Sequence, residues 1–283
     1  MITFRTMQRD DISAGLSLCR AAGWNQLARD WQEFLNLSPN DCRVAVDDSG
    51  KVVGTVTTVR YGDHFSWIGM VLVDPSTRKQ GIGMRLLKES LLILKNEKTV
   101  KLDATPAGRE VYLKLDFKDE YYLSRMHCPS VPANAFIMGN QVRLTEQNDL
   151  LKIFDYDPKV FGAKRDSLLG WMWNGAPELS FVYERAGEIA GYCFARLGEN
   201  FTHIGPVVAR DESIAQELVA ATLKKCSGKE VIIDAPHHSR AWLNWLTHNG
   251  FSEQRPFMRM FIGDNKWPGK PEQQFAILGP EFG

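Results

Sequence analysis

The sequence has few cysteines and no long apolar run, and both absences narrow the kind of protein it can be. No apolar stretch approaches the roughly 18 residues that a membrane-spanning helix needs, so we expect no membrane partner. The first residues, MITFRTMQRDD, show no secretory signal pattern. The scattered cysteines form no C-x-x-C pair, which argues against a disulfide framework or a zinc site and favours a soluble cytoplasmic protein. They are Cys19, Cys42, Cys128, Cys193 and Cys226.

An excess of charge of either sign is also absent. The chain has 34 Lys+Arg and 34 Asp+Glu, so its formal net charge is zero. Neither half carries the basic field expected of a protein that binds nucleic acid or an anionic membrane, so we expect no nucleic-acid partner. The length of 283 residues allows one large domain or two ordinary ones. Composition alone indicates neither the fold nor the activity.

What the sequence does contain is one pattern of strands and helices that occurs twice. The first copy predicts, in order, strands at 51–59 and 67–73, a helix at about 81–95, a strand at 100–104, a short helix ending near 117, and a strand at 121–126. The second copy repeats this order at 187–194, 204–209, 212–225, 231–236, 249–251 and 257–260. Strands that alternate with helices indicate an α/β fold with a mixed sheet.

We therefore predict two tandem α/β domains, each with a splayed mixed sheet flanked by helices. The expected bounds are 1–130 and 141–283, because Pro129 and Pro132 interrupt the periodicity between them. Prolines and glycines over 265–283 predict an irregular tail, in which the apolar residues 275–278 could dock on another part of the chain.

The strongest local signal follows the predicted strand that ends at Val73. A polar, basic loop leads into a helix that opens with two glycines, and unpaired backbone N–H groups at such a helix start attract phosphate oxygens. The alternative is a strand–helix turn that binds no ligand and whose glycines allow tight packing. A Walker loop is absent, and the dinucleotide pattern fails because Leu86 stands at its third glycine. The candidate phosphate-binding residues are Arg78, Lys79, Gln80, Gly81, Ile82, Gly83 and Met84.

This loop resembles the acetyl-CoA pyrophosphate loop of the GNAT-superfamily N-acetyltransferases, whose pattern is [RQ]-x-x-G-x-[GA]. The segment from Arg78 to Gly83 matches it at every fixed position. Residues 111–117 are similar to the family's L-Y-x-x-L-G-F segment, but Asp116 stands where the family usually has glycine. Two further segments, 103–108 and 278–283, resemble recurring parts of tandem GNAT proteins with a degenerate second domain.

The resemblance implies an N-acetyltransferase that uses acetyl-CoA as co-substrate, without a metal, and acetylates a primary amine of a small molecule by direct attack. It implies that the pantetheine arm pairs with the backbone of Val71, Leu72 and Val73, and that Tyr112 protonates the departing thiolate. A packed aromatic is the alternative for Tyr112. The alternatives for the whole chain are a non-catalytic acyl-CoA-binding or sensor protein and a protein or peptide N-acetyltransferase.

The general base and the acceptor pocket are less defined. His64 and Asp103 are candidate bases, but a structural role is favoured for Asp103, because Asp234 occupies the matching place in the second copy. A proton transfer relayed by water remains open. Trp24, Asn25 and Trp67 are candidate acceptor residues along with Asp103, and a buried anchor is the alternative for either tryptophan. We interpret the adjacent histidines at 237–238 as loop residues.

The second copy lacks the features that would bind coenzyme A. Between its matching strand and helix it is about four residues shorter, and it has Asp211 and Glu212 in place of the basic glycine loop. Two acids would repel a pyrophosphate, whereas they suit an ordinary helix N-terminus. We predict that this half binds no coenzyme A and instead completes the acceptor site or supports the first half. The sequence leaves the oligomeric state open.

Overall fold

The computed structural model describes residues 1–133 and 136–283. The first half builds β1 (Thr3–Thr6), α1 (Ile12–Ala21), α2 (Ala28–Leu37), β2 (Arg43–Val46), β3 (Val52–Tyr61), β4 (Phe65–Val73), α3 (Ile82–Ile93), β5 (Thr99–Ala104), α4 (Pro106–Leu113) and β6 (Lys118–Cys128). The predicted strand–strand–helix–strand–helix–strand order is confirmed in this half.

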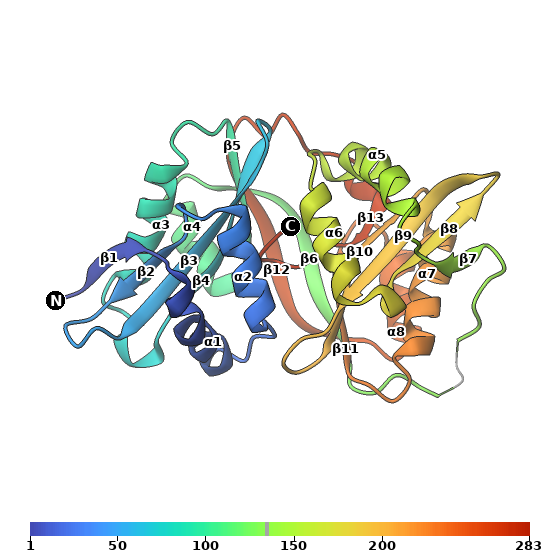
Figure 1. The fold of residues 1–283 in the computed structure, drawn as a ribbon, viewed down its shortest axis with the longest axis horizontal. Helices are drawn as coiled ribbons and strands as arrows, with labels where there is room; N and C mark the ends of the chain where they lie inside the picture. Colours follow the sequence, from blue (N-terminus) through green and yellow to red (C-terminus); the bar gives the residue numbers. More distant parts are fainter. Residues whose placement is uncertain (134–135) are drawn as a thin grey trace.

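The second half repeats the order. It builds β7 (Val142–Leu144), α5 (Asp149–Phe161), α6 (Asp166–Gly175), β8 (Phe181–Arg185), β9 (Glu188–Arg196), β10 (Thr202–Ala209), α7 (Glu212–Lys225), β11 (Val231–Pro236), α8 (Arg240–His248), β12 (Ser252–Gly263) and β13 (Gln274–Ala276). Four short 3-10 turns lie at Arg9–Asp11, Pro75–Thr77, Pro177–Leu179 and Pro271–Gln273. The two copies stand side by side in Figure 1.

The two halves share one mixed sheet because each gives the last strand of its repeat, β6 or β12, to the other. The strand order through the centre is β4-β5-β12-β6-β11-β10, so β12 of the second half pairs with β5 of the first, and β6 of the first half pairs with β11 of the second. Both exchanged strands run through the middle of the molecule (Figure 1). The fold class is confirmed, whereas the bounds 1–130 and 141–283 stay a prediction, since the sheet is continuous across them.

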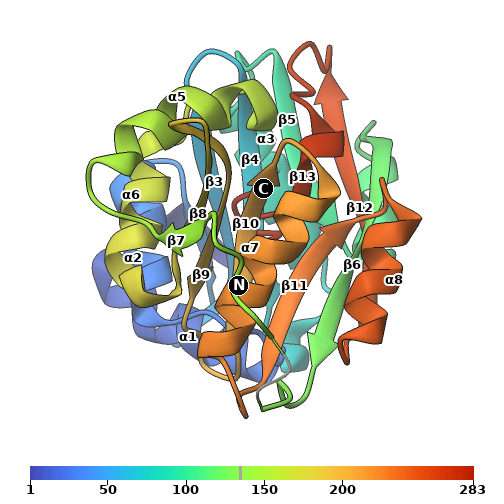
Figure 2. The ribbon, with the colours of Figure 1, turned by 90° about the vertical axis from the view of Figure 1, so that its right-hand side faces the viewer.

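Helices cover both faces of this sheet and bury the three larger of its hydrophobic cores. On one face, α1 and α2 join α5 and α6 over a core that spans both halves, with Trp31, Phe34 and Phe161 inside it; Figure 2 shows these four helices together on one side. On the other face, α3 closes a core of the first half through Leu86 and Leu87. There α7 closes a separate core of the second half. No helix among residues 1–133 and 136–283 combines the length and apolarity that crossing a bilayer requires.

The irregular tail docks on the molecule, as its apolar residues suggested. The 274–283 segment begins with β13, which pairs with β10, and continues toward the first half. There Phe282 stacks on Phe34 at a centroid distance of 4.3 Å, and its carbonyl oxygen accepts a hydrogen bond of 2.5 Å from the Tyr61 hydroxyl. The 274–283 segment therefore ties the sheet of the second half to the core of the first.

Candidate functional site

Strands β4 and β5 separate where a ligand arm could enter. They pair in parallel only at Ser66 with Val100 and at Trp67 with Lys101. Beyond Trp67, the backbone of β4 over residues 68–73 has no ladder partner on this side among the described residues. The predicted pantetheine-pairing residues Val71, Leu72 and Val73 lie along this open stretch. An extended ligand can add there as a further strand, because unpaired backbone groups accept a new ladder.

A bulge in β4 lies at the start of the open stretch. The register with β3 passes from Thr57 opposite Gly69 to Thr55 opposite Leu72, and Met70 between them has a positive φ of 51°. Such a backbone conformation is uncommon for a residue other than glycine, and bulges of this kind often lie beside active sites. The Thr55 hydroxyl donates to the Met70 carbonyl oxygen at 2.9 Å. Because this hydrogen bond occupies the Met70 carbonyl oxygen, the neighbouring backbone N–H groups are the polar groups of the bulge that remain for a ligand.

The basic loop after β4 leaves the start of α3 open. Lys79 and Gly81 have positive φ values of 64° and 78°, and Gly81 precedes the helix without a side-chain cap. The first helical hydrogen bond runs from Arg85 N–H to Gly81. The N–H groups of Ile82, Gly83 and Met84 thus have no acceptor within the helix and point to a phosphate-binding helix start. Arg78, Lys79 and Gln80 are exposed beside it.

The second copy has a different helix start. The Asp211 carboxylate accepts a hydrogen bond of 3.0 Å from the Ile214 N–H and caps α7. This is the ordinary helix N-terminus that the sequence predicted. Asp211 and Glu212 also place negative charge where the first copy presents Arg78 and Lys79.

The gap between strands exists in the second copy too, but the chain itself fills it. Strands β10 and β11 pair only over residues 202–204. Beyond that point β13 pairs with Val207 and Val208 of β10, and the Ile277 N–H donates to the Asp234 carbonyl oxygen of β11 at 3.0 Å. In addition, Pro206 stands where the first copy has Met70 and brings no backbone N–H.

One cavity joins the open end of β4 to the last helix of the first half. Several predicted residues line it: Trp24, Val71, Asp103 and Tyr112, together with Gly69 and Met70. Other lining residues were not among the predicted site residues: Gln26, Arg125, Arg255, Phe257 and Glu281. Three of these last five come from beyond residue 250, so the second half forms one wall of the cavity.

Tyr112 enters the cavity from α4. That helix begins as predicted, with Thr105 accepting a hydrogen bond from the Gly108 N–H at 3.2 Å and Pro106 in the first position. Burial raises the pKa of Tyr112 to about 12, so its hydroxyl keeps its proton at neutral pH. Within 1–133 and 136–283 this hydroxyl forms no hydrogen bond, which leaves its proton available to a ligand.

Asp103 holds the exchanged strand instead of standing free. Its carboxylate receives two hydrogen bonds of 2.9 Å from Arg259 of β12. The same geometry recurs in the second copy, where Arg125 of β6 donates twice to Asp234 at 2.8 Å. Each half thus supplies an arginine to the other half's aspartate. These pairs support the structural role that the sequence favours for Asp103, with Arg259 as its partner.

Two of the four candidate acceptor residues lie elsewhere. Asn25 is buried against the second half, where its side chain donates to the Phe201 carbonyl oxygen at 3.0 Å and accepts from the N–H of Asn200 at 2.9 Å. Trp67 is 1% exposed, donates to the Pro280 carbonyl oxygen at 2.9 Å and lies under the Arg259 guanidinium. Neither lines the cavity, because both serve as anchors between segments.

The histidines also lie outside the cavity. The ring of His64 packs at 4.3 Å against Trp267, so the structure does not support it as a base. His237 lies 2.7 Å from the Ser124 hydroxyl, and His238 packs against Tyr121. No group of three or more metal-ligating side chains occurs in the part of the chain that the structure describes.

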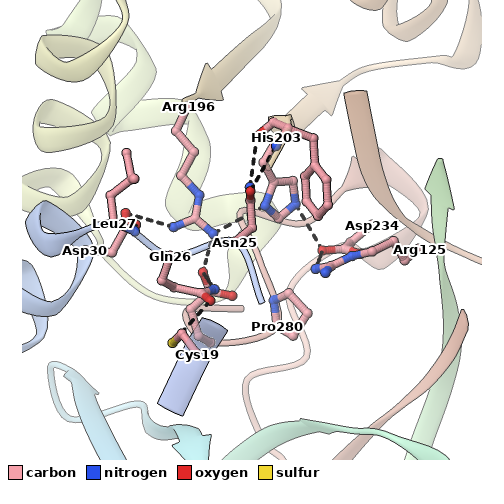
Figure 3. Close-up of polar contacts among 12 residues, drawn as sticks. Cys19, Asn25, Gln26, Leu27, Asp30, Arg125, Arg196, His203, Asp234 and Pro280 are labelled. Carbon is pink, nitrogen blue, oxygen red and sulfur yellow. Dashed lines mark hydrogen bonds and ion pairs between the residues drawn. The ribbon is translucent and has the colours of Figure 1, made fainter. Parts of the chain in front are cut away.

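A buried polar network supports the Glu281 carboxylate at the cavity wall. Gln26 donates to its Oε1 at 2.9 Å, and Arg196 donates to the same oxygen and to Asp30. Figure 3 shows Arg196 between the Asp30 side and the Gln26 side of this network. Burial alone would raise the pKa of Glu281, but the charge of the Arg196 guanidinium and the hydrogen bonds from Arg196 and Gln26 lower it below its usual range. Glu281 is therefore a fixed negative charge.

The same network continues to the second exchanged ion pair. The Nδ1 of His203 lies 3.3 Å from Arg196, and its Nε2 lies 3.0 Å from the Asp234 carboxylate (Figure 3). An arginine can only donate, so Nδ1 accepts and Nε2 carries the proton of a neutral ring. Burial lowers the pKa of His203, which agrees with a neutral ring at this place. The charges of the cavity wall are thus linked from α2 to β6.

Comparison with known proteins agrees with the repeat. Models of the acetyltransferase (GNAT) domain match residues 38–119 and, separately, residues 153–276. The chain is 27% identical to a holothin acyltransferase from Pseudoalteromonas sp. (strain SANK 73390) over 93% of its own length and 88% of that protein. It is 21% identical to an uncharacterized N-acetyltransferase, YitH, from Bacillus subtilis (strain 168), over 98% of its length and 97% of the relative.

Solved structures share the fold over nearly the whole chain. A crystal structure of a protein from Pyrococcus horikoshii superposes with a TM-score of 0.81 at 22% identity, covering 100% of this chain and 96% of the other. A tandem GNAT protein from the clavulanic acid biosynthesis pathway gives a TM-score of 0.67 at 13% identity, covering 93% of this chain and 98% of the other. These identities establish likeness of fold alone.

Proposed function

Because the chain belongs to the GNAT acetyltransferases, with two such domains in tandem, we propose that it transfers an acetyl group from acetyl-CoA to the primary amine of a small molecule. One observation carries this proposal most directly. The bulge at Met70 and the phenolic side chain of Tyr112 line the same cavity, at the point where β4 and β5 separate. A thioester lying there would meet an amide donor on one side and a proton donor on the other.

Each part of the chain then has a definite role. The N–H groups at the start of α3 bind the pyrophosphate, and the open stretch of β4 orients the pantetheine arm. A backbone N–H at the bulge donates to the thioester oxygen and stabilises the negative charge that builds there. The neutral amine attacks the carbonyl carbon, so a C–N bond forms and the C–S bond breaks. Tyr112 gives its proton to the departing thiolate.

Glu281 is better suited to holding the amine than to deprotonating it. Its lowered pKa makes it a weak base, yet Glu281 lines the cavity beside the bulge. A Cβ added to Gly69 would lie 2.6 Å from the Glu281 carbonyl oxygen, so the segment presses directly on β4. We assign the amine proton to water, with Glu281 accepting a hydrogen bond from the amine nitrogen.

Thiol release with a panel of amino acids, polyamines, aminoglycosides and peptides tests this function. We expect acetyl-CoA-dependent turnover with at least one small amine of the panel and none with the peptides. If the chain binds acetyl-CoA and acetylates no amine of the panel, a binding or sensor protein is favoured instead. If only the peptides react, the small-molecule acceptor is wrong.

Calorimetric titration should find one acetyl-CoA bound per chain. The second copy has an acid-capped helix, a proline at the bulge and β13 in its gap, so we expect no second binding event. A stoichiometry near two would contradict this expectation.

Replacing Arg78 by alanine should weaken acetyl-CoA binding about fivefold, corresponding to about 1 kcal/mol for an exposed charged contact. Added salt should shrink the difference, since it screens exposed charges. Lys88→Ala is the matched control, because it removes an exposed positive charge from α3, the helix that follows the loop, away from its N-terminus. Equal dissociation constants for Arg78→Ala and the unaltered protein would remove the loop from the binding site.

A further inference from the structure

Arg255 is a cation in the cavity wall that the protein does not neutralise. It lies on β12 opposite Arg125 of β6, three residues before Met258, which pairs with the last residue of β5. Its guanidinium forms neither a hydrogen bond nor an ion pair with any residue of 1–133 or 136–283. Its Nε is fully buried without a partner. A buried donor without an acceptor costs about 1–3 kcal/mol, so a ligand that supplies an acceptor is favoured.

The other charges around the cavity are already paired. Asp103 is held by Arg259, and Asp234 is held by Arg125. Glu281 lines the same cavity but shares Arg196 with Asp30 and forms no ion pair with Arg255. None of these three carboxylates is therefore left for Arg255. The Phe257 ring, 5.0 Å from the guanidinium, supports it from one side and brings no negative charge.

Arg255 keeps its positive charge at neutral pH. Burial and the nearby Arg125 lower its pKa to about 10, which still leaves the guanidinium protonated. The phosphates of coenzyme A belong to the loop at 78–84, and no residue of that loop lines the cavity. The anion that Arg255 receives must then belong to the molecule that shares the cavity with the thioester.

We infer that the acceptor is an amine that also carries a carboxylate, and that this carboxylate pairs with Arg255. The inference rests on the proposed function for the amine, which lies between Glu281 and the bulge at Met70. An amino-acid-like acceptor places its negative group at the unpaired cation and its nitrogen at the fixed anion. Arginine suits this task because its planar fork can bind a carboxylate through two hydrogen bonds.

Paired acceptors test the inference. The full chain is assayed by thiol release with L-alanine, L-phenylalanine and L-glutamine, and with the amide of each, which keeps the amine and loses the carboxylate charge. We expect kcat/KM to favour the carboxylate form by about 20-fold, the size of a hydrogen bond to a charged group. In Arg255→Gln this ratio should fall toward one, and Arg255→Lys should restore part of it.

Arg240→Gln is the matched control, since it removes an exposed arginine outside the cavity and should keep the ratio. A ratio that Arg255→Gln leaves intact, or a preference for the amides, would overturn the inference. If no amine reacts, the proposed function fails, and the inference about Arg255 is then tested by the binding of the amino acids alone. Calorimetry with the same amino acids should then still show carboxylate binding that Arg255→Gln abolishes, and equal binding or none at all counts against Arg255.

Discussion

Replacing Tyr112 by phenylalanine should lower kcat for acetyl transfer about 100-fold or more while acetyl-CoA binds as before, since a positioned general acid contributes about 10²–10⁴-fold. The substitution removes only the hydroxyl, and that hydroxyl forms no hydrogen bond within the described chain. Its loss therefore does not disturb the packing of the ring against Phe117. Steady-state kinetics with a reactive amine, together with calorimetry for acetyl-CoA, measures both quantities.

Tyr122→Phe is the matched control for this experiment. The Tyr122 ring is 58% exposed and lies outside the cavity that holds Tyr112. We expect its kcat to equal that of the unaltered protein. Should Tyr112→Phe also keep its kcat, with acetyl-CoA bound normally, the thiolate must take its proton from another source and Tyr112 serves only packing.

Arg259→Met should destabilise the protein by about 3–5 kcal/mol, because it leaves the buried Asp103 carboxylate without its counter-charge. Arg259 also donates to the Tyr121 hydroxyl and covers the Trp67 ring, so the variant loses these contacts as well. The affected contacts join β12 to β5 and thus the second half to the first. Urea unfolding followed by fluorescence and far-UV circular dichroism gives the change in the free energy of unfolding.

Two comparisons separate burial of a charge from loss of a side chain. In the double variant Arg259→Met with Asp103→Asn, the unpaired charge is gone, so part of the stability should return. Arg85→Met breaks the exposed pair of Arg85 with Glu89 and should cost less than about 1 kcal/mol. A loss for Arg259→Met no larger than that for Arg85→Met would show that the crossed pairs contribute little.

Much of the fold could be predicted from the sequence, because the helices and strands depend on the local spacing of apolar residues and glycines. Apolar spacing and glycines predict α3 and the strands around it, and the same pattern in the second half predicts the tandem repeat. The basic loop at 78–84 was also readable, because a phosphate-binding helix start is a contiguous feature. The exchange of β6 and β12 could not be predicted from the sequence. It depends on contacts between residues more than one hundred positions apart, and no local pattern records such contacts.

The cavity shows the same limit. Tyr112 was found from a short motif, but Arg255 and Glu281 lie in segments whose sequence resembles a strand and an irregular tail. Their importance comes from what surrounds them: one lacks a partner, and the other is fixed by Arg196 and Gln26. Asn25 and Trp67 were predicted as acceptor residues but lie outside the cavity. In a sequence, polar and aromatic side chains at an interface between segments look the same as those of a binding site.

The exchanged strand β12 has a consequence for synthesis of the protein on the ribosome. Strand β5 is complete at Ala104, but the strand that covers its edge begins at Ser252. Through most of translation the emerging first half therefore carries an uncovered sheet edge, which is the kind of surface that pairs with other chains. We expect the nascent chain to need shielding by chaperones until β12 leaves the exit tunnel, and the finished protein to fold as one cooperative unit.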